Sequence, residues 1–187
     1  MKKITFILLF SLVFSALSFS QSTGTFQEEF RIAVGVNAIQ DLETRKPFSD
    51  FDEWAFKTPI SVGLEYLFAE NWSLEQSFSF NKYNTYKNST FEQSKDYSYF
   101  STDTSVKYYL NKLIKSNKFD VFASGGLGVY NIDDLNTSFN LGGGLLYWFN
   151  DTIGLRGTAL GKFALNISDN VYENNHFQYK LELIIKL

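Results

Sequence analysis

The chain lacks cysteine altogether, and its 187 residues include only one histidine, one methionine and two prolines. The absence of cysteine excludes disulfide bonds, thiolate catalysis and a cysteine-linked lipid anchor. The net charge is only −3, which excludes the strong basic field of a nucleic-acid-binding protein, so we expect no nucleic-acid partner. Aromatic residues are abundant instead, with 20 Phe, 11 Tyr and 3 Trp, and this enrichment favours strands. The length of 187 residues indicates a single domain.

The first 20 residues have the order of a secretory signal peptide. Two lysines precede an apolar run over residues 4–17, and the small residues Ser18 and Ser20 stand just before Gln21. A charged segment, an apolar segment and a small-residue cleavage site follow one another in such peptides. The run is short for an uncleaved membrane anchor. We therefore predict a cleaved signal peptide at 1–20 and one exported domain at 21–187.

No later stretch is a continuous apolar run long enough for a membrane helix, but eight segments alternate between apolar and polar side chains. In the last segment, HFQYKLELIIKL, Phe177 and Tyr179 lie on one face, whereas Lys180 and Glu182 lie on the other. A period of two residues predicts a β-strand with two different faces. The predicted strands are 30–38, 60–68, 72–81, 99–110, 119–130, 138–149, 152–165 and 176–187.

The connectors between these segments alternate in length. Residues 69–71 and 150–151 form short connectors, and residues 111–118 form one of moderate length. The remaining connectors are generally longer and polar: 40–58, 84–96, 131–136 and 166–175. Short periplasmic turns that alternate with longer outer loops, on an even number of strands, are typical of outer-membrane barrels. The sequence therefore predicts an all-β fold, an eight-stranded antiparallel up-and-down transmembrane β-barrel.

Closure of this barrel assigns the two faces of each strand. Lipid cannot pair backbone groups, so the last strand must pair with the first, and Leu187 belongs to that seam. The charged face then points into the lumen, where we predict a network of Arg31, Glu65, Glu75, Asp103, Lys107, Asp120, Arg156, Lys162, Lys180, Glu182 and Lys186. The apolar face points to lipid, where we predict aromatic girdles of Tyr66, Phe68, Trp72, Phe80, Phe119, Tyr147, Phe149, Phe163, Phe177 and Tyr179.

The lumen charges are nearly balanced, with six basic and five acidic residues. Eight strands enclose an interior just wide enough for side chains to fill. Charges withdrawn from bulk water must pair or stay hydrated. We therefore predict a polar plug and a structural role in the envelope, with a narrow channel gated by rearranged ion pairs as the alternative.

The chain also resembles a known family. Its signal peptide, eight alternating segments and terminal FQYKLELIIKL resemble OmpA-type outer-membrane β-barrels of Gram-negative bacteria, often described as porin-family proteins. DEWAFKTPISVGLEYLF, WSLEQSFSFNKYN, TSVKYYLNKLI, FDVFASGGLGVY and GGGLLYWFNDTIGLRGTALGKFAL are similar to the barrel half of OmpA-family proteins of Bacteroidetes. The resemblance implies recognition of the last strand by the barrel-assembly machinery, although Leu187 stands where the family commonly has an aromatic residue. It also leads us to expect no C-terminal peptidoglycan-binding domain.

Catalysis is not expected from this sequence. His176 and Ser168 could act as base and nucleophile, but no third group orients them. We expect the histidine to be solvated in a loop, and no cluster has the spacing of metal ligands. The three consecutive glycines at 142–144 lie in an alternating strand and indicate close packing or a bend rather than a phosphate loop. We accordingly predict no cofactor and no metal.

The first long loop carries an aromatic segment, KPFSDFDEWAFK, that has two interpretations. Phe48, Phe51, Trp54 and Phe56 stand among acidic residues and could contact a surface ligand as an adhesin does. We favour packing of these rings over the barrel rim or into the outer girdle, because interfacial aromatics are ordinary in such barrels. A soluble lipocalin-type barrel with its apolar face inward is a further alternative, and outer-membrane lipid is the partner that we expect.

Overall fold

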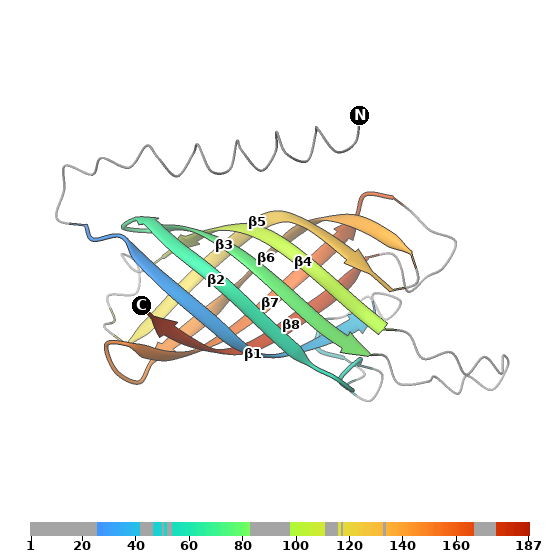
Figure 1. Cartoon of the computed structure of the whole chain (residues 1–187), viewed down its shortest axis with the longest axis horizontal. Coiled ribbons are helices and arrows are strands. Elements are labelled where there is room, and N and C mark those ends of the chain that lie inside the picture. Colours follow the sequence, from blue (N-terminus) through green and yellow to red (C-terminus); the bar gives the residue numbers. More distant parts are fainter. Residues whose placement is uncertain are drawn as a thin grey trace, which may run out of the picture.

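The computed structural model describes residues 26–41, 47–49, 51, 54–82, 98–110, 116, 118–132, 134–166 and 175–187. In this part of the chain, eight antiparallel strands close into a barrel in sequence order (Figure 1). The strands are β1 (Glu29–Asp41), β2 (Ile60–Ala69), β3 (Trp72–Lys82), β4 (Ser98–Tyr109), β5 (Phe119–Asn131), β6 (Leu135–Trp148), β7 (Ile153–Ala164) and β8 (His176–Lys186). The predicted all-β, eight-stranded up-and-down barrel is confirmed.

The barrel closes with a fixed stagger. Successive paired residues around the wall are Arg31, Glu65, Glu75, Ser105, Gly126, Asn140, Lys162 and His176, and His176 pairs with Asp41, ten residues further along β1. The stagger requires strongly tilted strands, which Figure 1 shows. Because side chains alternate between the two faces, the residues on this line all lie on the inner face.

The β1–β8 seam explains why the chain end is ordered. Eleven residue pairs join the two strands, from Arg31–Lys186 to Asp41–His176. The amide of Leu187 then donates to the carbonyl of Phe30 over 2.9 Å. The predicted pairing of the last strand with the first is therefore present.

Two predicted connectors differ from the structure. Residues 131–136 do not form a long loop, because Asn131 pairs with Leu135 and only three residues separate β5 from β6. The strand pairing continues through residues that look polar enough for a loop. In the connector predicted over 40–58, Gln40 and Asp41 still belong to β1, because β8 continues to pair with β1 up to that point.

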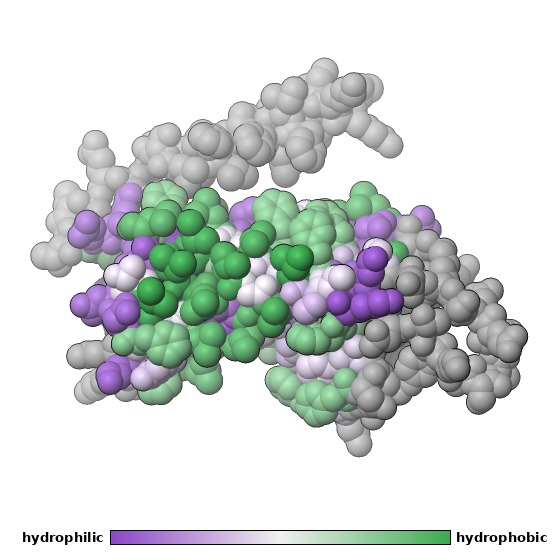
Figure 2. All heavy atoms as spheres, turned by 60° about the horizontal axis from the view of Figure 1, so that its bottom comes forward, coloured by the Kyte–Doolittle hydropathy of each residue, from purple (hydrophilic) through white to green (hydrophobic). Residues whose placement is uncertain are grey.

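The outer surface carries the apolar faces of the strands. Figure 2 shows a broad hydrophobic band across one side of the barrel, with hydrophilic residues towards the ends. Val34, Leu141 and Leu183 are about half exposed on this surface, whereas charged residues fill the interior. A lipocalin-type barrel would have the opposite arrangement, so that alternative is wrong. Within the described ranges, no helix has the length and hydrophobicity needed to cross a membrane.

The predicted girdle residues lie on the outward face near the two ends. We call the end of the barrel with the short β2–β3 and β6–β7 connectors the turn end, and the opposite end the loop end. At the turn end, Tyr66 stacks on Phe30 at 4.6 Å between ring centroids, and Phe119 contacts Tyr147 at 4.9 Å. Tyr66 also lies near Phe68, Tyr147 near Phe149, and Trp72 contacts Tyr108. At the loop end, Phe80 contacts Phe100 and Phe177 stacks on Tyr179, while Phe163 is exposed near the end of β7.

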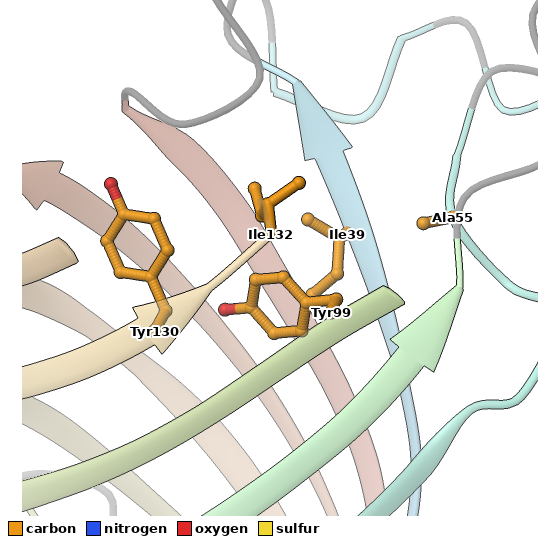
Figure 3. Close-up of a cluster of buried hydrophobic side chains, with 5 residues drawn as sticks. All are labelled: Ile39, Ala55, Tyr99, Tyr130 and Ile132. Carbon is orange, nitrogen blue, oxygen red and sulfur yellow. The ribbon is translucent and has the colours of Figure 1, made fainter. Parts of the chain in front are cut away.

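A small apolar cluster closes the interior at the loop end. Figure 3 shows Ile39, Ala55, Tyr99, Tyr130 and Ile132 gathered from β1, the first loop, β4, β5 and the residue just after β5. All five side chains are buried. Smaller clusters around Leu146 and around Phe122 are also buried. The remaining interior that the structure describes is largely polar, and it forms the candidate functional site.

Candidate functional site

The centre of the interior is the guanidinium group of Arg156, which extends from β7 into the lumen. Its Nη1 donates to Glu65 Oε2 over 2.8 Å, and its Nη2 lies 2.6 Å from Glu75 Oε2 and 2.8 Å from Glu182 Oε2. The three carboxylates come from β2, β3 and β8. Arg156 is fully buried, so it joins four strands across a space that solvent does not reach.

Neighbouring groups supply further bonds to these carboxylates. Lys107 Nζ donates to Glu75 over 2.6 Å and lies 3.4 Å from Glu65. Serine hydroxyls donate to the other carboxylate oxygens: Ser73 to Glu65 over 2.5 Å and Ser61 to Glu182 over 2.7 Å. Buried charges are costly unless paired and hydrogen-bonded. Here Glu65 and Glu182 each have both a cation and a neutral donor, and Glu75 is bonded by two cations, Arg156 and Lys107.

The network continues towards the turn end through Tyr109 and Arg31. The Tyr109 hydroxyl donates to Glu65 Oε1 over 2.6 Å and accepts from Arg31 Nη1 over 3.1 Å. The Arg31 guanidinium also lies over the Trp148 ring, 5.2 Å from its centroid, and pairs with Glu29. The chain of contacts therefore runs from the middle of the lumen to its turn-end opening.

Two predicted network members lie at this opening rather than inside. Lys186 pairs with Glu29 over 3.2 Å and sits 4.3 Å from the Trp148 ring centroid. Asp120 accepts a hydrogen bond from Trp148 Nε1 over 2.7 Å. Both side chains are half-buried, because each stands near the turn-end terminus of its strand, so neither joins the buried network. The other nine predicted lumen residues are buried.

A second polar cluster lies nearer the loop end. Lys162 Nζ contacts both oxygens of Asp103, at 2.8 and 2.9 Å, and donates to the Tyr99 hydroxyl over 3.1 Å. Asn140 Nδ2 donates to Asp103 over 2.8 Å, and Ser138 donates to Asn140 over 2.7 Å. Gly128 makes room for this arrangement, since a Cβ there would stand 2.1 Å from Asp103 Oδ1.

His176 is not solvated, contrary to the sequence-based prediction. It is the first residue of β8, its side chain is buried, and its Nε2 lies 3.0 Å from the Tyr99 hydroxyl. Tyr130 contacts its ring edge-on at 4.8 Å. The prediction failed because His176 is already paired as the first residue of β8, and its even position places it on the inward face with Gln178 and Lys180. Ser168, its imagined catalytic partner, lies outside the described residues.

Lys180 lies between the two clusters, and its Nζ donates to the Ser77 hydroxyl over 2.8 Å. Its neighbour along the inward face of β8, Gln178, has no hydrogen-bond partner within the described part for either atom of its amide. The Ser79 hydroxyl, the next inward position after Ser77, likewise lacks one there. The region between the two clusters is therefore polar, but Gln178 and Ser79 are less tightly bonded than the side chains of either cluster.

Sequence reasoning missed the inward tyrosines and the neutral donors. Tyr99 and Tyr109 lie an even number of residues from Ser101, Asp103 and Lys107 on β4, so their spacing places them on the charged face. They were not assigned to either face, yet each hydroxyl binds charged lumen residues. Strand parity was the signal that could have found them.

The first loop packs its aromatic residues against the barrel. Trp54 stacks on Tyr179 of β8 with centroids 4.5 Å apart, and Phe48 contacts the same ring at 4.6 Å. Phe51 contacts Trp54 at 4.7 Å, whereas Phe56 is exposed. This is the arrangement that we favoured over a free adhesive patch. The acidic residues Asp50, Asp52 and Glu53 lie outside the described residues.

The interior geometry is suited to cross-linking strands rather than to a reaction. Its cations and carboxylates are engaged with one another, and the described residues include no group of three or more His, Cys, Asp or Glu that could hold a metal ion. Hydrogen bonds between ionised groups are stronger than neutral ones. The arrangement can therefore hold opposite walls of the barrel together.

Comparisons with known proteins agree with this architecture. A family model for the outer membrane protein beta-barrel domain matches residues 6–183. The chain is similar in structure to OprG of Pseudomonas aeruginosa, with a TM-score of 0.58, 12% identity, and coverage of 85% of this chain and 96% of that one. It is also similar to Neisserial surface protein A, with a TM-score of 0.56, 11% identity, and coverage of 86% of this chain and 97% of that one. The N-terminal barrel of P. aeruginosa OprF gives a TM-score of 0.52 and 14% identity, with coverage of 86% of this chain and 100% of that one. No curated protein sequence matches the chain.

Proposed function

Because this chain belongs to the outer-membrane β-barrel family, we propose that it is a structural protein of the outer membrane whose lumen is plugged by its interior ion pairs. The observation that carries this proposal is the contact of Arg156 with three carboxylates from three other strands, at zero exposure. A solute would have to break several charge-assisted bonds at once to pass this level.

Planar-bilayer recording of the purified barrel tests the plug. We expect little or no steady conductance, since eight strands leave a lumen that side chains can fill. The measurement needs protein whose folding is checked by heat-dependent gel mobility, so that a silent bilayer is not explained by unfolded protein. A large, stable, solute-permeable channel in the folded protein would overturn the proposal.

A narrow channel is the second candidate, favoured by the polar region between the two clusters. The Gln178 amide and the Ser79 hydroxyl are buried there without a hydrogen-bond partner among the described residues. Rearrangement of the pairs of Arg156 and Lys107 would be needed to connect this region to the turn-end opening. Small, voltage- or salt-dependent openings that increase in an Arg156→Met variant would favour this candidate over the plug.

The export route and assembly partners are also proposals. Residues 1–20 would direct secretion and be removed, and the terminal strand β8 would be recognised by the barrel-assembly machinery before it pairs with β1. We propose no enzymatic activity. Mass spectrometry of the protein purified from the outer membrane tests the first point, because a chain beginning at Gln21 is expected and one that retains Met1 would contradict cleavage.

A further inference from the structure

Two outward-facing residues of β1 are unexpectedly buried. Phe30, Ile32, Val34 and Val36 lie on the lipid-facing side and are exposed, in keeping with their alternation. Ala38 and Gln40 continue the same face but retain only 9% and 3% exposure. Something other than lipid must therefore cover the loop-end part of β1 on the outside of the barrel.

The covering group is part of the first loop, which we call the aromatic clasp and define as Phe48, Ser49, Phe51, Trp54 and Ala55. Gln40 Nε2 donates to the Ser49 carbonyl over 3.1 Å, and Gln40 Oε1 accepts from the Phe48 amide over 3.2 Å. The Tyr179 hydroxyl also donates to Gln40 Oε1, over 2.8 Å. The polar amide on the outer face is thus satisfied by the protein itself.

The clasp is anchored on both sides of β1. Ala55 pairs with Ile39 through two backbone hydrogen bonds of 2.9 and 3.2 Å, and its side chain is buried in the interior cluster (Figure 3). The adjacent Trp54 extends across the outer face to stack on Tyr179 of β8, with an interplanar angle of 9°. Its indole Nε1 donates to the Ser49 carbonyl over 2.8 Å. The clasp therefore lies across the β1–β8 seam, and the hydrogen bond from Trp54 to Ser49 joins its two ends.

Backbone conformation supports a defined role for this turn. Phe48 has a φ of 61°, which is uncommon for a bulky residue and persists only when the surroundings hold it. Here the amide of Phe48 is bonded and its ring rests on Tyr179. The conformation brings the Phe48 ring onto the outer wall of the barrel.

The outward side of the clasp is aromatic and open. Phe48 is 58% and Phe51 66% exposed, whereas the polar amide of Gln40 is hidden beneath them. Through Tyr179 the rings are continuous with Phe177 of the loop-end girdle. Aromatic side chains gather where the acyl chains of a bilayer meet its head groups.

We propose that the aromatic clasp binds lipid, with Phe48 and Phe51 inserted at the boundary between head groups and acyl chains of the outer leaflet. This interaction goes beyond the plugged lumen and does not depend on it. Its partner is bilayer lipid because the exposed rings continue, through Tyr179 and Phe177, the lipid-facing surface of the barrel wall. The first loop then covers the seam from the lipid side instead of extending into water.

Site-directed spin labelling in phosphatidylcholine nanodiscs tests this placement. The chain has no cysteine, so Phe51→Cys provides a unique attachment point at an exposed position. Val34→Cys gives a reference on the lipid-facing wall, and Asp151→Cys gives a reference in the exposed β6–β7 turn. Folding of each labelled protein is checked by heat-dependent gel mobility. The measurement compares the accessibility of each spin label to oxygen, which concentrates in lipid, with its accessibility to a water-soluble nickel complex.

The label at position 51 should lose most of the nickel accessibility seen at position 151 and show oxygen accessibility approaching that at position 34. Nickel accessibility equal to that at position 151 would overturn the proposal, since the clasp would then face water. Shielding from both reagents together with line broadening between labels would also overturn it, because a second copy of the chain would cover the rings.

Discussion

Replacement of Arg156 by methionine tests whether the interior is a dry, interlocked network. Methionine keeps much of the apolar volume of the side chain but removes every bond from the guanidinium group. Three buried carboxylates, Glu65, Glu75 and Glu182, then lie near one another, and Lys107 pairs with only the first two. We expect the folded barrel to lose about 3–5 kcal/mol, the usual cost of breaking a buried ion pair from one side.

The size of this loss can be estimated in a second way. Two carboxylates about 5 Å apart repel by about 3 kcal/mol at the effective dielectric constant of about 20 used for protein sites. Protonation of one of them can relieve the repulsion, and holding an ordinary glutamate protonated at pH 7 costs about 3–4 kcal/mol. The two estimates agree. Because protonation becomes easier in acid, the deficit of the variant relative to the wild type should shrink as the pH falls towards 4.

Urea unfolding in phospholipid vesicles, followed by tryptophan fluorescence at pH 7 and pH 4, measures both effects. Lys186→Met is the matched control, since that lysine forms one pair with Glu29 at the rim and its side chain is 29% exposed. A rim pair contributes at most about 1 kcal/mol. A loss for Arg156→Met no larger than for Lys186→Met would refute the reasoning, because it would mean that water already solvates the carboxylates.

Two further predictions concern the polar cluster around Asp103 and the β1–β8 seam. Gly128→Ala should destabilise the barrel by about 1–3 kcal/mol in the same unfolding assay, because the new Cβ would stand 2.1 Å from Asp103 Oδ1. The control Gly157→Ala should change the stability little, because no atom lies within 4 Å of its new Cβ. An equal effect of the two substitutions would contradict the packing described for Asp103. Deletion of Ile185–Leu187 should reduce assembly into membranes, because it leaves backbone groups of Phe30, Arg31 and Ile32 unpaired in lipid. Membrane yield and protease resistance equal to those of the full chain would count against this register.

The fold was readable from the sequence because a lipid-exposed barrel leaves a simple pattern. The alternation is clearest in β8, where Leu181, Leu183 and Ile185 face out and Lys180, Glu182 and Ile184 face in. Lipid on one side and a polar interior on the other impose this alternation over the whole length of a strand. Strand ends were less certain, since residues such as Asn131 and Gln40 are polar but still paired.

The site was only partly predictable, for a different physical reason. Parity places a side chain inside the barrel, but it does not say which inward side chains meet across the lumen. Arg156 on β7 contacts Glu75 on β3, which lies four strands away in either direction around the barrel, and this contact depends on the ten-residue stagger and on side-chain length. His176 and Tyr99 illustrate a further limit, because the hydrogen bond between them joins β8 to β4 across the lumen, and no spacing within one strand predicts such a contact.

The pairing of Ala55 with Ile39 has a consequence for engineering the surface of this barrel. Beyond Gly35 the pairing of β1 with β2 ends, and the returning arm of the first loop completes the wall, with Ala55 on Ile39 and Lys57 donating to the carbonyl of Lys82. Loop insertions usually cost little stability, but here the segment just before β2 carries wall contacts. A foreign peptide displayed on the cell surface would therefore be better grafted after Ile132, between β5 and β6, where the strands are already paired up to Asn131 and Leu135 and the buried Ile132 keeps its place.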